Sequence, residues 1–225
     1  MAEGEWTWTT APTSGRAIVE LCGRLEGRRL NQGTSGNVSV RQRSRGADGY
    51  LITPSALRYD QMGPTDVVWV GFDGTIRGKR GPSSEWRFHQ RIYEARPDVG
   101  AVVHVHSPSA TAFSALREDL PPFHYMVAAA GGSSIRCAPY ALFGSEELAA
   151  HAVAALDGRD ACLLGNHGQI TVAAELDDAA ALAVEVEALC EQYLQVRAFG
   201  PALLSEEEMS EVLAKFESYR EGTAQ

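Results

Sequence analysis

The side chains best suited to chemistry in this 225-residue chain are one glutamate and three histidines. Glu85 follows Pro-Ser-Ser, His104 and His106 are separated by one valine, and His167 lies further on in Asn-His-Gly. Because side chains alternate between the two faces of a β-strand, we expect His104 and His106 to share one face while the neighbouring valines point into a core. Together the four side chains would form an open metal site.

The His-Val-His run alone fits metal ligands and structural residues equally well, and its position beside Glu85 and before His167 favours metal ligands. A lone histidine on an alternating strand is usually partly buried and satisfied by a hydrogen bond, whereas two imidazoles on one face are costly to bury without partners. Three neutral imidazoles hold zinc and still leave it free to polarise a substrate oxygen. We therefore predict a catalytic metal site at His104, His106 and His167, with Glu85 beside it.

Three hydroxyl-rich segments predict an anion site. In Gly33-Thr34-Ser35-Gly36-Asn37, two glycines surround small hydroxyl residues, so backbone N–H groups can turn inward and form a nest. Thr53-Pro54-Ser55 ends a predicted strand, and Ser83-Ser84 precedes a predicted helix, whose N-terminal dipole favours an anion. Each segment alone is ordinarily a turn or a cap. Together they predict a phosphate cradle that requires no Lys or Arg.

Composition and charge limit the classes of partner. The net charge of −9 argues against a broad nucleic-acid surface, which needs clustered Lys and Arg, but not against an anionic small substrate beside a bound cation. No apolar run reaches the roughly 18 to 20 residues needed to cross a membrane, and residues 1–13 lack the features of a signal peptide. The cysteines are scattered, with no Cys-x-x-Cys motif, as is typical of a reducing compartment. We predict a cytoplasmic protein with no nucleic-acid or membrane partner.

Hydrophobic periodicity and turn residues predict an α/β protein, with residues 1–13 as a flexible tail and 14–225 as a single domain. The predicted strands are 37–41, 50–53, 66–72, 101–106, 161–165 and 169–173. The predicted helices are 14–30, capped by Ser14, 83–95, capped by Ser83, one starting at Ser107-Pro108, 145–156, and two at the end, the last opened by Ser205. Because several strands precede the first strand-helix-strand unit, we expect three layers, with helices flanking a mixed, largely antiparallel sheet.

Seven blocks of the sequence closely resemble the class II aldolase/adducin family. They are GTSGNVSVR, LITPS, PSSEWRFH, AVVHVHSPSATA, FHYMVAAAGG, CAPYALFG and NHG. The resemblance runs from about Ala17 to Tyr219, nearly the whole chain, in consistent order and spacing. It implies a zinc-dependent aldolase that cleaves a ketose 1-phosphate, such as L-fuculose 1-phosphate, to dihydroxyacetone phosphate and an aldehyde (L-lactaldehyde) through a metal-stabilised enediolate.

The resemblance also implies roles for individual residues. One Zn²⁺ per subunit would be held by the three histidines, and Glu85 would be the acid/base that touches the metal at rest. Tyr125 would donate a proton near the aldehyde oxygen, and Tyr219 would reach the active site of a neighbouring subunit in a C4 homotetramer with sites between subunits. The phosphate would be bound by Thr34, Gly36, Asn37, Ser55, Ser83 and Ser84.

One departure from the family pattern leaves the substrate open. Family members usually have glycine after Thr-Pro-Ser, where this chain has Ala56, so a methyl group could crowd the phosphate. The alternatives on the same fold are a methylthioribulose-1-phosphate dehydratase, a sugar-phosphate epimerase and a decarboxylase. The epimerases carry Asp at the position of Glu85, which counts against them. A non-catalytic, adducin-like module would lack the metal ligands that this chain retains.

Overall fold

The computed structural model describes residues 13–42, 44 and 46–220. The strands are β1 (Asn37–Arg41), β2 (Gly49–Ile52), β3 (Val68–Gly71), β4 (Ile76–Arg77), β5 (Ala101–Val105), β6 (Arg136–Ala138), β7 (Ala161–Leu164) and β8 (Gly168–Ala173). The α-helices are α1 (Thr13–Gly27), α2 (Trp86–Ala95), α3 (Pro108–Ser114), α4 (Glu146–Ala155), α5 (Leu176–Val196) and α6 (Glu206–Arg220). Three short 3₁₀ helices are η1 (Tyr59–Gln61), η2 (Tyr125–Ala130) and η3 (Arg197–Phe199).

The strands form one eight-stranded sheet in the order β4-β3-β2-β1-β5-β8-β7-β6. Its neighbouring strands pair antiparallel, with the exception of the parallel pair β6 and β7. In the middle of the sheet, β1 pairs with β5 so that Asn37 lies opposite His104. On its other side, β5 pairs with β8, where His104 lies opposite Ile170. The mixed, largely antiparallel sheet predicted from the sequence is confirmed.

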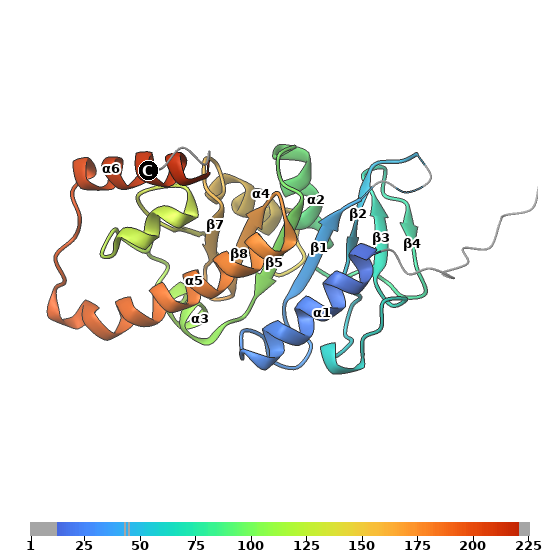
Figure 1. Ribbon diagram of the computed structural model, residues 1–225. Helices are drawn as coiled ribbons and strands as arrows, with labels where there is room; N and C mark the ends of the chain where they lie inside the picture. The colour runs from blue at the N-terminus through green and yellow to red at the C-terminus, as the bar shows by residue number, and fades with distance from the viewer. Residues whose placement is uncertain (1–12, 43, 45, 221–225) are drawn as a thin grey trace, which may run out of the picture.

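Helices cover both faces of the sheet and complete three layers (Figure 1). Helices α1 and α5 cover one face, where their apolar side chains pack on Val38, Val103 and Val105. Helices α2 and α4 cover the opposite face and pack against each other. The apolar residues of α2, Phe88 and Ile92, are four positions apart and therefore share the side of the helix that faces the sheet.

The alternation along β5 decides where the first histidine points. Val103 and Val105 pack under α1 and α5, while Val102 belongs to the core on the α2 side. His104 shares the face of Val102 because the side-chain period of a strand is two, and its ring meets the edge of Phe88 from α2. The predicted separation of His104 from Val103 and Val105 is therefore confirmed.

Several element boundaries differ from those predicted. Ser14 lies inside α1, which begins at Thr13 and ends at Gly27 rather than near Leu30. Helix α2 begins at Trp86, not at Ser83, because the side chain of Ser83 closes a turn onto the backbone N–H of Glu85 instead. The strands β4 and β6 were not predicted, since segments of two and three residues are too short to carry a periodic pattern. Residues 1–12 of the expected tail lie outside the described residues.

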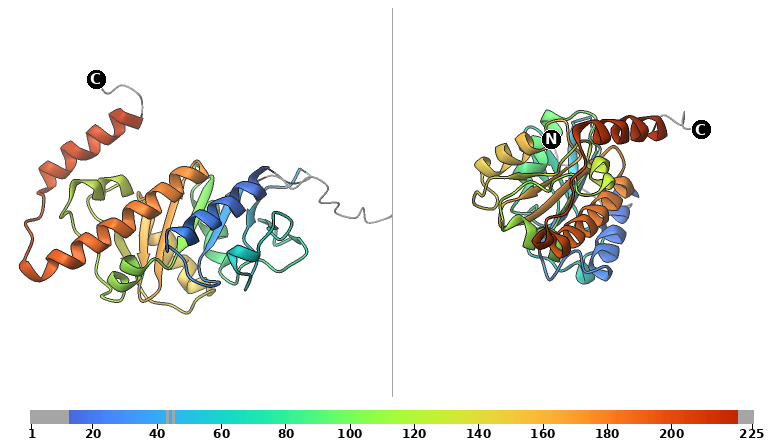
Figure 2. Two further views of the ribbon diagram at one scale, coloured as in Figure 1. Left: turned by 60° about the horizontal axis from the view of Figure 1, so that its bottom comes forward. Right: turned by 90° about the vertical axis from the view of Figure 1, so that its left-hand side faces the viewer.

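At the β6–β7 end of the sheet, α3, α5, α6 and η2 enclose a third apolar cluster. Helix α6 packs there through Met209, Val212 and Phe216, and its C-terminal end projects from the body (Figure 2). No helix within the described ranges is both long and apolar enough to cross a membrane.

Candidate active site

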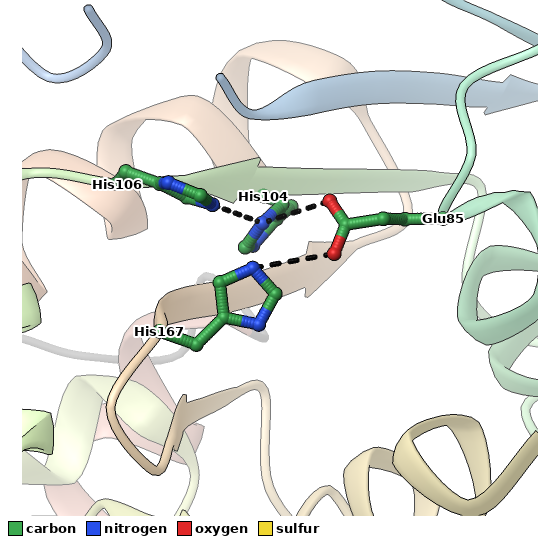
Figure 3. A group of neighbouring side chains, drawn as sticks. All are labelled: Glu85, His104, His106 and His167. Carbon is green, nitrogen blue, oxygen red and sulfur yellow. Dashed lines mark hydrogen bonds and ion pairs between the residues drawn. The ribbon is translucent and has the colours of Figure 1, made fainter. Parts of the chain in front are cut away.

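Glu85 and the three predicted histidines converge on one point, as Figure 3 shows. One ligand atom from each of them lies within 4.8 Å of all the others. Nε2 of His104 is 2.9 Å from Nε2 of His106 and 3.3 Å from a carboxylate oxygen of Glu85. Nε2 of His167 is 3.2 Å from the other oxygen of the same carboxylate.

Three stretches of backbone hold these four side chains. Glu85 is the residue immediately before α2, and its side chain forms no helix cap because it points into the cluster. His104 lies on β5, and His106 follows the end of that strand. His167 comes from the three-residue turn between β7 and β8, in which Asn166 has a φ of 55°. Asparagine tolerates this left-handed conformation better than most residues, so the turn can present His167 inward.

The backbone fixes which nitrogen of His104 is free. Nδ1 of His104 lies 2.8 Å from the carbonyl oxygen of Gln169, so this nitrogen carries the proton and donates it. The lone pair of a neutral imidazole is then on Nε2, which faces the other ligands. A backbone carbonyl that orients a histidine in this way is a common second partner of metal ligands.

Burial and charge set the protonation of the cluster. Burial by itself would raise the pKa of the Glu85 carboxyl, but the His104 and His167 imidazoles outweigh it and hold that pKa well below its usual range. Burial, together with the neighbouring His104 and His167 rings, lowers the pKa of His106 to about 3. The carboxylate is therefore ionised and His106 is neutral near pH 7, which are the states that metal coordination requires.

The chemistry of this donor set fits a metal ion. Two Nε2 atoms at 2.9 Å from each other cannot both donate, and the buried Oε1 of Glu85 has no hydrogen-bond partner within the described residues, although His167 is in contact with it. A cation at the centre would interact at once with Nε2 of the three histidines and with the carboxylate of Glu85. Three imidazoles and a carboxylate are a common ligand set of zinc.

A cavity of about 390 Å³ opens beside the cluster, and Glu85, His106 and His167 are part of its wall. Every residue predicted for phosphate binding lines the same cavity: Thr34, Gly36, Asn37, Ser55, Ser83 and Ser84. Among the described residues around this cavity, none is Lys or Arg. Tyr140 and Phe143 contribute aromatic surface to the wall.

Long-range backbone pairing brings the hydroxyl-rich segments together. Pro54 and Pro82 form an isolated antiparallel bridge. On either side of it, the N–H of Ser83 donates to Thr53 O at 3.0 Å, and the N–H of Ser55 donates to Gly81 O at 3.1 Å. The N–H of Thr53 also donates to Val38 O at 3.0 Å, next to the Gly33–Asn37 segment, so all three segments meet at the cavity, as the cradle interpretation requires.

Backbone conformation explains two features of the cradle. Gly36 has a φ of 73°, and a Cβ there would lie 2.4 Å from the side-chain amide of Asn31, so only glycine fits. Oδ1 of Asn31 in turn accepts the backbone N–H of His106 at 2.9 Å. Ala56 has a φ of 54°, which is the left-handed region that favours glycine, and this accounts for the glycine usual in the family.

The two predicted tyrosines do not line this cavity in a single chain. Tyr125 begins η2 and has an exposed fraction of 51%, and Tyr219 lies on α6 with 65%. Their roles stay predictions.

Sequence reasoning missed several residues that support the site. Asn31 and Gln169 orient the backbone of His106 and the ring of His104, respectively. Arg117 donates to the side chain of Asn166 at 2.7 Å, beside His167. No periodic pattern or motif marks these residues, because each acts through a contact between segments far apart in sequence.

The comparisons with known proteins agree with this geometry. The model of a family described as "Class II Aldolase and Adducin N-terminal domain" matches residues 16–194. A 5-methylthioribulose-1-phosphate/5-deoxyribulose-1-phosphate aldolase of Rhodospirillum rubrum is 51% identical over 191 residues, which are 84% of this chain and 85% of that protein. An L-fuculose phosphate aldolase of Escherichia coli K12 is 46% identical over 206 residues, covering 91% and 94% of the two chains. A solved structure of L-fuculose 1-phosphate aldolase superposes with a TM-score of 0.87 at 37% identity, covering 92% and 98%.

A three-layer fold with a buried Glu/His cluster at the edge of a cavity defines a lyase of the aldolase type. The chain belongs to the class II aldolase/adducin family, as its motifs predict. Because Glu85 and all three histidines are in place, the non-catalytic alternative is disfavoured.

Proposed function

We propose that this protein is a zinc-dependent aldolase that cleaves a ketose 1-phosphate to dihydroxyacetone phosphate and an aldehyde. The observation that carries the proposal is a single cavity with a Glu/His₃ cluster on one wall and a hydroxyl-rich cradle on another. A ketose 1-phosphate has its phosphate next to the carbonyl at C2, so one cavity can hold both ends of the reacting half.

The phosphate would be bound by neutral donors. The hydroxyl groups of Thr34, Ser55, Ser83 and Ser84 surround the cavity, and α2 begins directly behind Glu85, with the positive end of its dipole facing the same side. Binding without a cationic side chain leaves the strongest local charge to the metal site. Ala56 is part of the cavity wall, and alanine, like glycine, keeps a backbone N–H.

Aldol cleavage breaks the C3–C4 bond of the sugar. When bound, a divalent cation would polarise the oxygens at C2 and C3 and stabilise the negative charge that develops there. As the aldehyde forms, the hydroxyl at C4 releases its proton to solvent through the group next to that oxygen, and the electron pair of the broken C3–C4 bond moves toward C2. Glu85 is ionised in the free site, so it would take up one proton from solvent and deliver it to C3, which completes dihydroxyacetone phosphate.

We infer that a neighbouring copy of the chain completes the site in a C4 homotetramer. Tyr125 and Tyr219 are exposed and lie outside the cavity of their own chain, and the C-terminal end of α6 projects from the body (Figure 2). Tyr125 from the neighbour would relay the proton at the aldehyde oxygen, passing it to solvent in cleavage and donating it in the reverse, synthetic direction, and Tyr219 would close the site.

Mixed tetramers test this arrangement. Tyr125→Phe and Glu85→Gln subunits, each inactive alone, should regain activity when they are mixed, unfolded and refolded together, because some sites then combine an intact Glu85 with an intact Tyr125. Mixed tetramers that stay inactive would place both residues in the same subunit's site or remove Tyr125 from the reaction.

Two substrates have specific support. L-Fuculose 1-phosphate is favoured by the relatives at 46% identity over most of the chain. A 5-deoxy or 5-methylthio ribulose 1-phosphate is favoured by the relative at 51% identity and by the aromatic wall of Tyr140 and Phe143, which suits an aldehyde with a short apolar end. The Rhodospirillum rubrum relative is named an aldolase. It therefore supports the sugar phosphate that the dehydratase alternative would act on, but it does not support dehydration.

The direct test is release of dihydroxyacetone phosphate from a panel of ketose 1-phosphates, each with and without a chelator. Chelator-sensitive release restored best by Zn²⁺ is the expected result, and the highest kcat/KM identifies the substrate. Metal-loaded protein that releases none from any of them would refute the aldolase proposal and favour dehydration, epimerisation or decarboxylation. We also propose a cytoplasmic location, which the four free cysteines of the described chain support.

A further inference from the structure

A buried chain of hydrogen bonds leads from Glu85 away from the cavity into the protein. Nδ2 of Asn37 donates to Oε2 of Glu85 at 2.8 Å, and Oδ1 of Asn37 contacts Nε2 of His89. Nδ1 of His89 is 2.7 Å from Oγ of Ser39, which is 2.8 Å from the hydroxyl of Tyr93. These five side chains come from β1, from α2 and from the residue before α2.

The charge of Glu85 determines the direction of every hydrogen bond in this chain. An ionised carboxylate can only accept, so Asn37 must turn its NH₂ group toward Glu85 and its oxygen toward His89. Nε2 of His89 must then carry a proton. In the neutral ring Nδ1 accepts from Ser39, and the hydroxyl of Ser39 is left to accept from Tyr93.

The surroundings leave no alternative for these groups. His89 and Ser39 have no exposed surface, and Asn37 has 2%. The ring of His89 is stacked on Phe88, with 4.6 Å between the centroids. Burial lowers the pKa of His89 to about 3, so the ring is neutral near pH 7.

Asn37 is also a wall residue of the cavity and one of the predicted phosphate ligands. Its amide nitrogen carries two protons, of which one goes to Glu85. The second is available to a phosphate oxygen. If the amide were reversed, its oxygen would face the carboxylate and the phosphate, and both contacts would become repulsive.

We propose that His89 is a positioning residue that holds the Asn37 amide in the one orientation able to serve Glu85 and the substrate phosphate together. This inference rests on the proposed function, since it assigns the phosphate and the base to the same reaction. His89 itself touches neither substrate nor metal. It acts through Asn37, and Ser39 and Tyr93 hold its proton on Nε2.

Two substitutions separate this role from packing. His89→Gln can place an amide N–H near the position of Nε2 and keep the donor to Asn37, whereas His89→Asn reaches only the Ser39 side. Both replace the ring with a smaller polar amide, so a purely structural role would impair both. His151→Asn, at a histidine on α4 that bonds to the carbonyl of Pro139, is the control for the change itself.

In zinc-loaded protein, we expect His89→Asn to lower kcat by about 10- to 100-fold, as loss of a supporting hydrogen bond around a metal site does. Binding of inorganic phosphate, followed by calorimetry, should weaken by about 5-fold, the effect of one neutral hydrogen bond. Zinc content should not change. His89→Gln should recover most of both losses, and equal impairment in the two variants would overturn the inference.

The tautomer of His89 gives a readout that does not depend on activity. Nitrogen-15 NMR of the zinc-loaded protein, with the signal assigned by its absence in His89→Gln, should show a neutral ring protonated on Nε2. A ring protonated only on Nδ1 would overturn the inference, because the Asn37 amide would then be reversed. If the unchanged enzyme cleaved no ketose 1-phosphate, the proposed function would fail, while the tautomer and phosphate measurements would still decide the orientation of Asn37.

Discussion

Replacing Glu85 by glutamine separates metal binding from proton transfer. The change keeps the size of the side chain and its contact with Asn37, but it removes the negative charge that faces His104 and His167 at 3.3 and 3.2 Å. Because Glu85 is 6% exposed, water cannot take over its place easily. The three imidazoles remain, and three protein ligands suffice for a catalytic zinc ion.

The expected loss follows from the role of a general acid/base. Such a group typically contributes about 10²- to 10⁴-fold to the rate, which corresponds to roughly 3 to 5 kcal/mol of barrier at 1.36 kcal/mol for each factor of ten. The amide cannot take up and return the proton at C3, so the loss should fall on kcat. KM should change little, since the phosphate cradle is intact.

The assay combines turnover of the best ketose 1-phosphate with zinc analysis of the same sample. Glu147→Gln, the same change at an exposed position in the first turn of α4, is the matched control and should behave like the unchanged protein. A near-normal rate in zinc-loaded Glu85→Gln would remove Glu85 from the mechanism. A variant that lost both zinc and activity would instead show that Glu85 is needed as a ligand.

The other predictions concern the metal, the cradle and the response to pH. His106→Ala should lose zinc and turnover together, with His151→Ala as control, and full zinc occupancy in His106→Ala would exclude His106 as a ligand. Ala56→Gly should raise stability by about 1 kcal/mol, because it relieves the left-handed φ of 54°, and a lower Tm would contradict this. The pKa of His89 lies at about 3 in the folded chain, below its ordinary value of 6.5. Below pH 6.5 the unfolded chain therefore binds a proton at His89 that the folded chain does not bind. The contribution of His89 to the free energy of unfolding is complete above pH 6.5 and is lost toward pH 3, at about 1.4 kcal/mol per pH unit. The free energy of unfolding, measured with urea between pH 7 and 5, should decrease as the pH falls, and it should decrease less steeply in His89→Gln. Equal slopes in the two proteins would refute the low pKa of His89.

The sequence predicted the features that depend on local order. The alternation of His104 with valines reports the period of a strand, and the core on both sides of β5 follows that period. The hydroxyl-rich turns and the glutamate before a helix are likewise properties of a few consecutive residues. The order of strands and helices was enough to predict three layers and a mixed sheet, and the motifs pointed to the four side chains that the structure brings together.

What joins these segments was decided by the tertiary structure. The pairing of β1 with β5 sets Asn37 opposite His104, and the Pro54–Pro82 bridge brings two hydroxyl-rich turns to one cavity. Sequence periodicity describes one element at a time, whereas each of these contacts joins residues at least 28 positions apart. For the same reason the predicted residues did not include Asn31 and Gln169, and His89 had no assigned role. A buried polar residue acquires its function only from the partner that the fold places opposite it, because away from water each donor and acceptor must find a match.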